Sequence, residues 1–191
     1  MKKIILPLLM VTALAVLSAC ASGGSTGGVK FRFTDYYPLK VGNTWTYRAT
    51  SFGDTNESAI LTAKVTGEKG GVYTIAQGQG TFSYTYDKFG LMKVKSRAYL
   101  LKDPIVSGAT WQVTIEGMQG TAKVIEAGVK IDVPAGTYES CAIIEEVFAG
   151  ITKLVSSYCP GVGLVRLEEY SLARSSADLV TKVELLAYMK E

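Results

Sequence analysis

Short runs of alternating apolar and polar residues constrain the fold of this chain more than any other feature of its sequence. In the runs 44–49, 81–86 and 111–116, an apolar or aromatic side chain occupies every second position. This period of two is typical of strands with one buried face. Glycine-rich turn signals separate such runs at 53–56, 67–71, 78–80 and 117–120. The runs follow one another too closely for the helical crossovers that parallel strands need.

We therefore predict an all-β fold with about ten antiparallel strands in meander order. A sheet this large must curl, close or split, because open edges are costly. The sequence leaves open a barrel, a curled half-barrel and a two-sheet sandwich. The segments 91–101 and 179–189 fit both a helix and a strand, and we favour a strand for each. Residues 29–191 are expected to form a single β domain.

The N-terminal residues have the features of an export signal. Lys2 and Lys3 precede an apolar run over 4–17, which is shorter than the roughly 20 residues of a membrane-spanning helix. The sequence Leu17-Ser18-Ala19-Cys20 resembles the lipobox of bacterial lipoproteins. The resemblance implies a signal peptide over 1–19 that is removed and a lipid attached to Cys20. The alternative is an ordinary secretory signal with a chance cysteine.

Residues 20–28 are then an acylated cysteine followed by a flexible tether of Ala, Ser, Thr and Gly. By the sorting pattern of enterobacterial lipoproteins, Ala21 implies transport to the outer membrane. The expected location is the cell envelope, with the membrane as partner through the lipid on Cys20.

Charge and composition argue against several functions. The chain carries 20 basic and 17 acidic side chains, and removal of Lys2 and Lys3 with the signal leaves a net charge of +1. This balance argues against a nucleic-acid partner. The absence of histidine excludes Ser-His-Asp catalysis, Cys-His catalysis and histidine-ligated metal sites. We predict no catalytic residue, no cofactor and no metal.

Neighbouring carboxylates at 145–146 and 168–169 point to opposite faces of a strand, so neither pair can act as one catalytic dyad. The basic stripe Lys93, Lys95 and Arg97 fits a solvated strand face better than a patch for anionic lipid.

Cys141 and Cys159 form an even pair once Cys20 is acylated, and an oxidising envelope favours a disulfide between them. A hairpin centred on Gly150 places the two cysteines opposite each other. A three-residue loop over 148–150 instead places Cys141 opposite Ser157, too far for an unstrained bridge. Two buried free thiols are the alternative.

Three motifs occur in a familiar order: YPLKVGNTWTY at 37–47, VPAGTY at 133–138 and PGVGLV at 160–165. Together they resemble small bacterial envelope lipoproteins and exported proteins of domain-of-unknown-function families. This resemblance implies an all-β, barrel-like exported domain and no activity. Residues of these motifs also have structural explanations, as turns over 133–136 and 160–161 and as aromatic core anchors.

The sequence leaves three functions in competition. The favoured one is a non-enzymatic domain that binds or scaffolds an envelope protein. The alternative is a carrier or chaperone for lipid or another apolar ligand, in a cavity lined by Trp45, Tyr47, Tyr84 and Tyr86. A hydrolase acting on cell wall or glycan has the least support.

Overall fold

One continuous antiparallel sheet of twelve strands is present in the part of the chain that this computed structural model describes, residues 31–191 without 54, 116 and 174–176. The all-β prediction and its meander order are confirmed, with twelve strands in place of about ten. The elements are α1 (Phe33–Tyr36), β1 (Thr44–Ser51), β2 (Glu57–Lys69), β3 (Val72–Gln77), β4 (Gly80–Tyr86), β5 (Gly90–Lys93), β6 (Ala98–Lys102), β7 (Thr110–Ile115), β8 (Met118–Val133), β9 (Gly136–Phe148), β10 (Thr152–Cys159), β11 (Gly163–Ser171) and β12 (Asp178–Met189).

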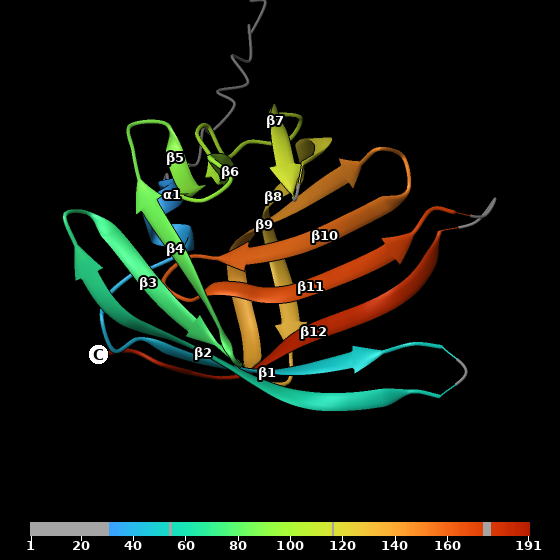
Figure 1. Ribbon diagram of the computed structural model, residues 1–191, viewed down its shortest axis with the longest axis horizontal. Helices are drawn as coiled ribbons and strands as arrows, with labels where there is room; N and C mark the ends of the chain where they lie inside the picture. Colours follow the sequence, from blue (N-terminus) through green and yellow to red (C-terminus); the bar gives the residue numbers. More distant parts are fainter. Residues whose placement is uncertain (1–30, 54, 116, 174–176) are drawn as a thin grey trace, which may run out of the picture. The chain divides into compact units, whose positions relative to one another are not determined.

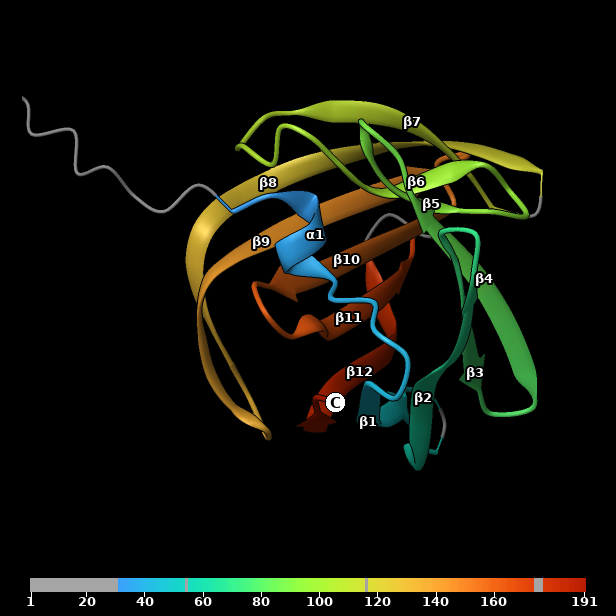
Figure 2. The same cartoon turned by 90° about the vertical axis from the view of Figure 1, so that its left-hand side faces the viewer.

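The strand order is β6-β5-β4-β3-β2-β1-β12-β11-β10-β9-β8-β7. Every neighbour is adjacent in sequence except β1 and β12, which pair with each other. The sheet curls into a nearly closed barrel, as Figures 1 and 2 show. Of the three architectures that the sequence left open, the barrel is therefore the observed one. Its two edge strands are β6 and β7, which follow each other in the chain.

The prediction of β structure is confirmed for both ambiguous segments, but one of them forms two strands in place of one. The segment 179–189 lies within β12. The segment 91–101 is split between β5 and β6 by a turn over 94–97, in which Arg97 has a positive φ of 54°. Because the chain reverses direction at this turn, one continuous alternation of buried and exposed side chains does not describe the segment.

The first helical turn, α1, was not predicted. Phe33 and Tyr36 are buried, at 1% and 4% exposure, and residues 31–39 form what we call the plug. Tyr36 Oη donates to the Ser140 carbonyl (2.9 Å), and the Asp35 carbonyl accepts from the Gly161 amide (2.7 Å). Figure 2 shows α1 across one end of the barrel. The plug thus joins β9 and the β10–β11 turn through its own hydrogen bonds.

The two predicted turns are present. Val133 pairs with Gly136 across the β8–β9 turn. The Val162 amide donates to the Cys159 carbonyl (3.2 Å), and Gly161 has a φ of +76°, as the third position of a type II turn requires. Proline at the second position is suited to the same turn type.

The β9–β10 hairpin has the register centred on Gly150. Phe148 pairs with Thr152, and Tyr158 pairs with Ala142. The structure contains a Cys141–Cys159 disulfide, with the two Cα atoms 4.2 Å apart. The alternative register, with Cys141 opposite Ser157, is wrong. The turn explains why the other register forms: Ala149 and Gly150 both have positive φ, and Thr152 is the first residue of β10 that pairs with β9.

The signal peptide 1–19, Cys20 and the tether 20–28 lie outside the described residues. Among the residues that are described, no helix is both long and apolar enough to cross a membrane.

Candidate functional site

The gap between the edge strands β6 and β7, which we call the seam, is where the barrel lacks a backbone ladder. A side chain bridges it: Trp111 Nε1 on β7 donates to the Tyr99 carbonyl on β6 (3.0 Å). Trp111 is 6% exposed, so this bond is shielded from water. The seam is therefore held by one indole at this point, in place of the paired amides that join the other strands.

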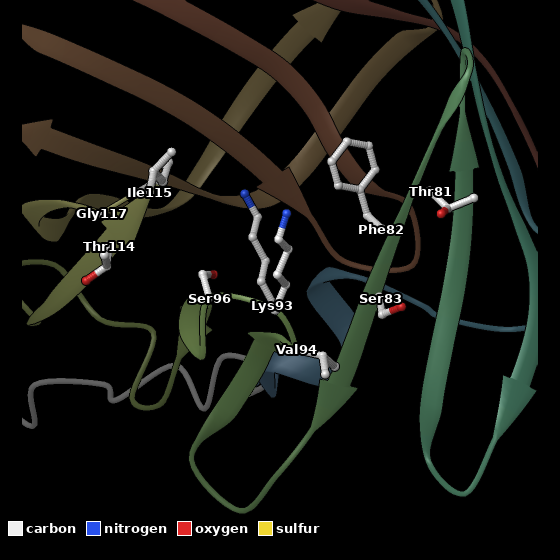
Figure 3. A pocket seen from close by; sticks show the side chains of 10 residues that line it. Thr81, Phe82, Ser83, Lys93, Val94, Ser96, Thr114, Ile115 and Gly117 are labelled. Atoms are coloured by element: carbon white, nitrogen blue, oxygen red, sulfur yellow. The ribbon is translucent and has the colours of Figure 1, made fainter.

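A cavity of about 620 Å³ opens beside the seam, and we call it the seam pocket. It lies between β4 and the β5–β6 turn on one side and the end of β7 on the other (Figure 3). Its described lining residues are Thr81, Phe82, Ser83, Lys93, Val94, Lys95, Ser96, Thr114, Ile115 and Gly117. The volume falls within the roughly 300–1,000 Å³ typical of small-molecule sites.

Among the described residues that line the seam pocket, none belongs to the plug. Tyr86 Oη on β4 donates to the Tyr37 carbonyl of the plug and accepts from the Leu39 amide (3.0 Å). Phe82 is four residues earlier on the same strand, so it lies about 13 Å further along it. Tyr37 of the plug also packs against Tyr84, two residues from Phe82, so the plug and the seam pocket are neighbours in the barrel interior.

The strand register brings a lysine into the pocket. Lys93 pairs with Tyr84, whose side chain is 8% exposed in the barrel core. Paired residues project to the same face of a sheet, so Lys93 faces the interior. Figure 3 shows its side chain extending into the space between Phe82 and Ile115. The expectation of a solvated stripe is therefore wrong for Lys93, which is half-buried, while Lys95 is exposed at the pocket rim.

A buried carboxylate lies behind Lys93. Glu146 on β9 is 7% exposed, and it lines a second cavity of about 10 Å³ that also touches Lys93 and Ile115. Burial raises the pKa of the Glu146 carboxyl, and the nearby Lys93 ammonium offsets part of that rise. Lys93 and Ile115 line both cavities, so they separate the seam pocket from Glu146.

The neighbouring Glu145 points to the opposite face, as the sequence predicted. Its carboxylate lies 3.9 Å from the ammonium of Lys153 on β10, and Lys153 sits diagonally from it rather than directly opposite. The two adjacent carboxylates are thus in different environments.

The four aromatic residues proposed as a ligand cavity lie in the core on the plug side. Trp45 and Tyr47 are 0% and 3% exposed, and they donate to the Val162 carbonyl (2.6 Å) and the Leu164 carbonyl (3.0 Å). Tyr37 of the plug packs against Trp45 and Tyr84, with ring centroids 5.5 and 6.2 Å apart. None of the four lines the seam pocket as described.

Burial keeps the tyrosines of this cluster protonated. The pKa of Tyr84 and that of Tyr86 are each raised to about 12, mainly by desolvation. Burial also raises the pKa of Tyr47 well above its ordinary value. They therefore act as neutral hydrogen-bond donors and packing groups.

Sequence reasoning missed Glu146 and the inward orientation of Lys93. The alternation Ile144, Glu146, Phe148 already places Glu146 on an apolar face, and this signal could have found it. No comparable local signal exists for Lys93, because its face depends on pairing with β4. Among the described residues, no group of three or more His, Cys, Asp or Glu side chains could hold a metal ion.

No protein-family model and no curated protein matches this chain. Two crystal structures are similar to it in fold. One is described as "a putative exported protein with YmcC-like fold" from Bacteroides fragilis NCTC 9343, at 15% identity over 81% of this chain and 98% of that one, with a TM-score of 0.45. The other is "a putative lipoprotein" from Parabacteroides distasonis ATCC 8503, at 14% identity over 83% and 100%, with a TM-score of 0.48.

Proposed function

We propose that this chain is a lipid-anchored, non-enzymatic binding protein of the bacterial envelope that holds a small apolar ligand in the seam pocket. The observation that carries the proposal is the 620 Å³ cavity beside the seam, in a barrel whose aromatic core is filled by its own plug. A cavity of this size beside an unpaired seam offers both room for a ligand and a route of entry. The carrier alternative from the sequence thus becomes the leading function, with a different set of residues.

The envelope location and the anchor rest on the lipobox at 17–20. Acylation at Cys20 would tether the barrel through residues 20–28, and Ala21 favours the outer membrane as its destination. Such a tether spans roughly 15 Å on average. The barrel would then take up and release its ligand close to the membrane surface.

Native mass spectrometry of the full-length chain tests the binding function. The chain is purified from a bacterial host in a detergent that is stripped off in the gas phase, and its mass is measured before and after organic extraction. We expect added mass that extraction removes, and less of it in Ser96→Trp, which places a bulky side chain at the pocket rim. Equal masses before and after extraction would contradict the proposal. Catalytic turnover abolished by Glu146→Gln would contradict its non-enzymatic part.

A scaffold for an envelope protein is the second candidate, and the unpaired edges of β6 and β7 favour it. An exposed strand edge can accept an extended segment of a partner as an additional strand. A photoreactive amino acid in place of Lys102 on β6 tests this candidate in intact cells. Capture of one defined envelope protein would support it, and recovery of none would count against it.

A further inference from the structure

The seam pocket combines an apolar wall with cationic groups on one side. Phe82, Val94 and Ile115 supply the apolar surface, and Phe82 and Val94 remain 45% and 37% exposed. Lys93 and Lys95 supply two ammonium groups. The other described lining residues are Ser, Thr and Gly, which carry no charge. A ligand that satisfies this pocket must have an apolar part and an anionic part.

The local charge indicates how many negative charges the ligand carries. Among the described lining residues the two lysines contribute two positive charges, and the Glu146 carboxyl lies behind Lys93. With Glu146 ionised, one positive charge remains unmatched among the described residues that line the two cavities. A single anionic headgroup balances it, whereas a cationic headgroup would meet both lysines.

The pocket size sets the scale of the apolar part. About 620 Å³ suits one ligand of drug-like size and is too small for a lipid with two long chains. On the basis of the proposed function, we infer that the seam pocket binds a single-chain amphiphile with one anionic headgroup, its headgroup on Lys93 and Lys95 and its chain against Phe82 and Ile115. A fatty carboxylate has this chemistry, and so does a monoalkyl phosphate in its singly ionised form, although at pH 7 the phosphate carries between one and two negative charges.

Photolabelling with matched probes tests the inference on the full-length chain in lipid nanodiscs. The probes are diazirine-bearing analogues of decanoate, decyl phosphate, decanol and decyltrimethylammonium, which differ only in the headgroup. Labelled peptides from β4 and β7 are quantified by mass spectrometry. We expect the two anions to label these peptides about tenfold more than decanol, from about threefold for each lysine contact, and the cation to label them less than decanol does. The stronger of the two anions identifies a carboxylate or a phosphate as the natural headgroup.

Substitutions assign the two parts of the ligand to residues. Lys93→Gln and Lys95→Gln should each lower anion labelling about threefold and leave decanol labelling unchanged. Lys130→Gln, at an exposed lysine on β8, is the matched control and should change neither. Phe82→Ala should lower labelling by all probes, whereas Phe89→Ala should not, because Phe89 is similarly exposed (49%) but does not line the pocket. A thermal unfolding curve for each variant confirms that it is folded.

The outcomes separate this inference from the proposed function. Pocket labelling that is equal for anion, alcohol and cation, or unchanged in both lysine variants, overturns the headgroup assignment and leaves apolar binding intact. Preferential labelling by the cation overturns it as well, and indicates that Glu146 dominates. Labelling of the β4 and β7 peptides by none of the probes overturns both the inference and the proposed function.

Discussion

At the scale of the residue, Glu146 is the clearest departure from what stability alone requires. Its carboxyl group is 7% exposed and lies among Ile144, Phe148 and Leu154, so it loses its hydration on folding. The attraction to the Lys93 ammonium offsets only part of this desolvation free energy. A buried titratable group beside a cavity is a candidate for a functional site. The free energy that burial of the Glu146 carboxyl costs is thus consistent with a role of this residue in setting the charge of the seam pocket.

The raised pKa of Glu146 predicts the pH dependence of stability. Below the ordinary carboxyl pKa both the folded and unfolded states are protonated, and the buried group carries no charge penalty. As the pH rises through the raised folded-state pKa, the unfolded state loses its proton first and the folded state becomes less stable. Glu146→Gln should therefore raise the melting temperature at pH 7, and the gain should shrink towards pH 4.

Glu145→Gln is the matched control, since Glu145 is adjacent but on the outer face beside Lys153. Its effect should stay within about 0.5 kcal/mol at both pH values, as is usual for surface substitutions. Calorimetric melting curves of both variants decide the matter. A Glu146→Gln protein that is less stable than the parent at pH 7 would show that the carboxylate makes a net favourable interaction.

At the scale of the element, the seam is the weakest joint of the barrel. Ten of the twelve strands have a ladder partner on both sides, and only β6 and β7 have one each within the described residues. The Trp111–Tyr99 hydrogen bond crosses the seam where a ladder is absent. Local opening in a barrel of this kind is expected where such joints lie. Ligand entry at the seam would use this mobility.

Trp111→Phe should loosen the seam. The substitution removes the indole donor to the Tyr99 carbonyl, worth about 1 kcal/mol, and leaves a smaller ring in place. We expect faster amide hydrogen exchange in β6 and β7 than in the parent. Trp45→Phe also removes an indole donor, to the Val162 carbonyl, but far from the seam. Equal acceleration of exchange in β6 by both variants would show that the bridge has no local role.

The disulfide joins β9 to β10 next to the turn that contacts the plug. It spans a sequence separation of 18, and closing such a loop stabilises a fold by about 3 kcal/mol in the chain-entropy model. The double variant Cys141→Ala, Cys159→Ala should therefore lower the unfolding free energy by about that amount. Denaturant titration measures it, with the reduced parent protein as control. An unchanged midpoint would mean that the bridge adds nothing to stability.

At the scale of the whole molecule, the described barrel has one end filled and a cavity elsewhere. Tyr36, Tyr37 and Leu39 of the plug are buried in the interior, and Tyr37 packs against Trp45, so the aromatic core there serves folding. The seam pocket, among the described residues, has room for a ligand. Attachment of acyl chains at Cys20 would contribute about 0.8 kcal/mol for each buried methylene, enough for permanent anchoring with two or three chains.

The anchor predicts acylation at one cysteine. Cells that express the full-length chain and are fed an alkyne-tagged palmitate should label the parent protein and Ser22→Ala. Cys20→Ala should lose the label entirely. Labelling that persists in Cys20→Ala would contradict the lipobox assignment, and absence of label in the parent would favour the ordinary secretory signal.

The sequence alone was sufficient for the strand class, the meander order and the turns at 133–136 and 160–161, because each depends on residues a few positions apart. It could not decide whether the sheet curls into a barrel. That depends on the pairing of β1 with β12, the first and the last of the described strands, which lie far apart in the sequence. Nor could it place the plug, whose residues are buried only by contacts with distant strands such as β9.

The candidate site was decided by tertiary structure. Lys93 lies on the inner face because of its register with Tyr84, and it approaches Glu146 because the barrel brings β5 and β9 around a common interior. Local alternation tells which residues share a face, but not which face is inside or what lies across the barrel. The sequence thus determined the strands and the aromatic core, while strand register and closure determined the seam pocket and its charge.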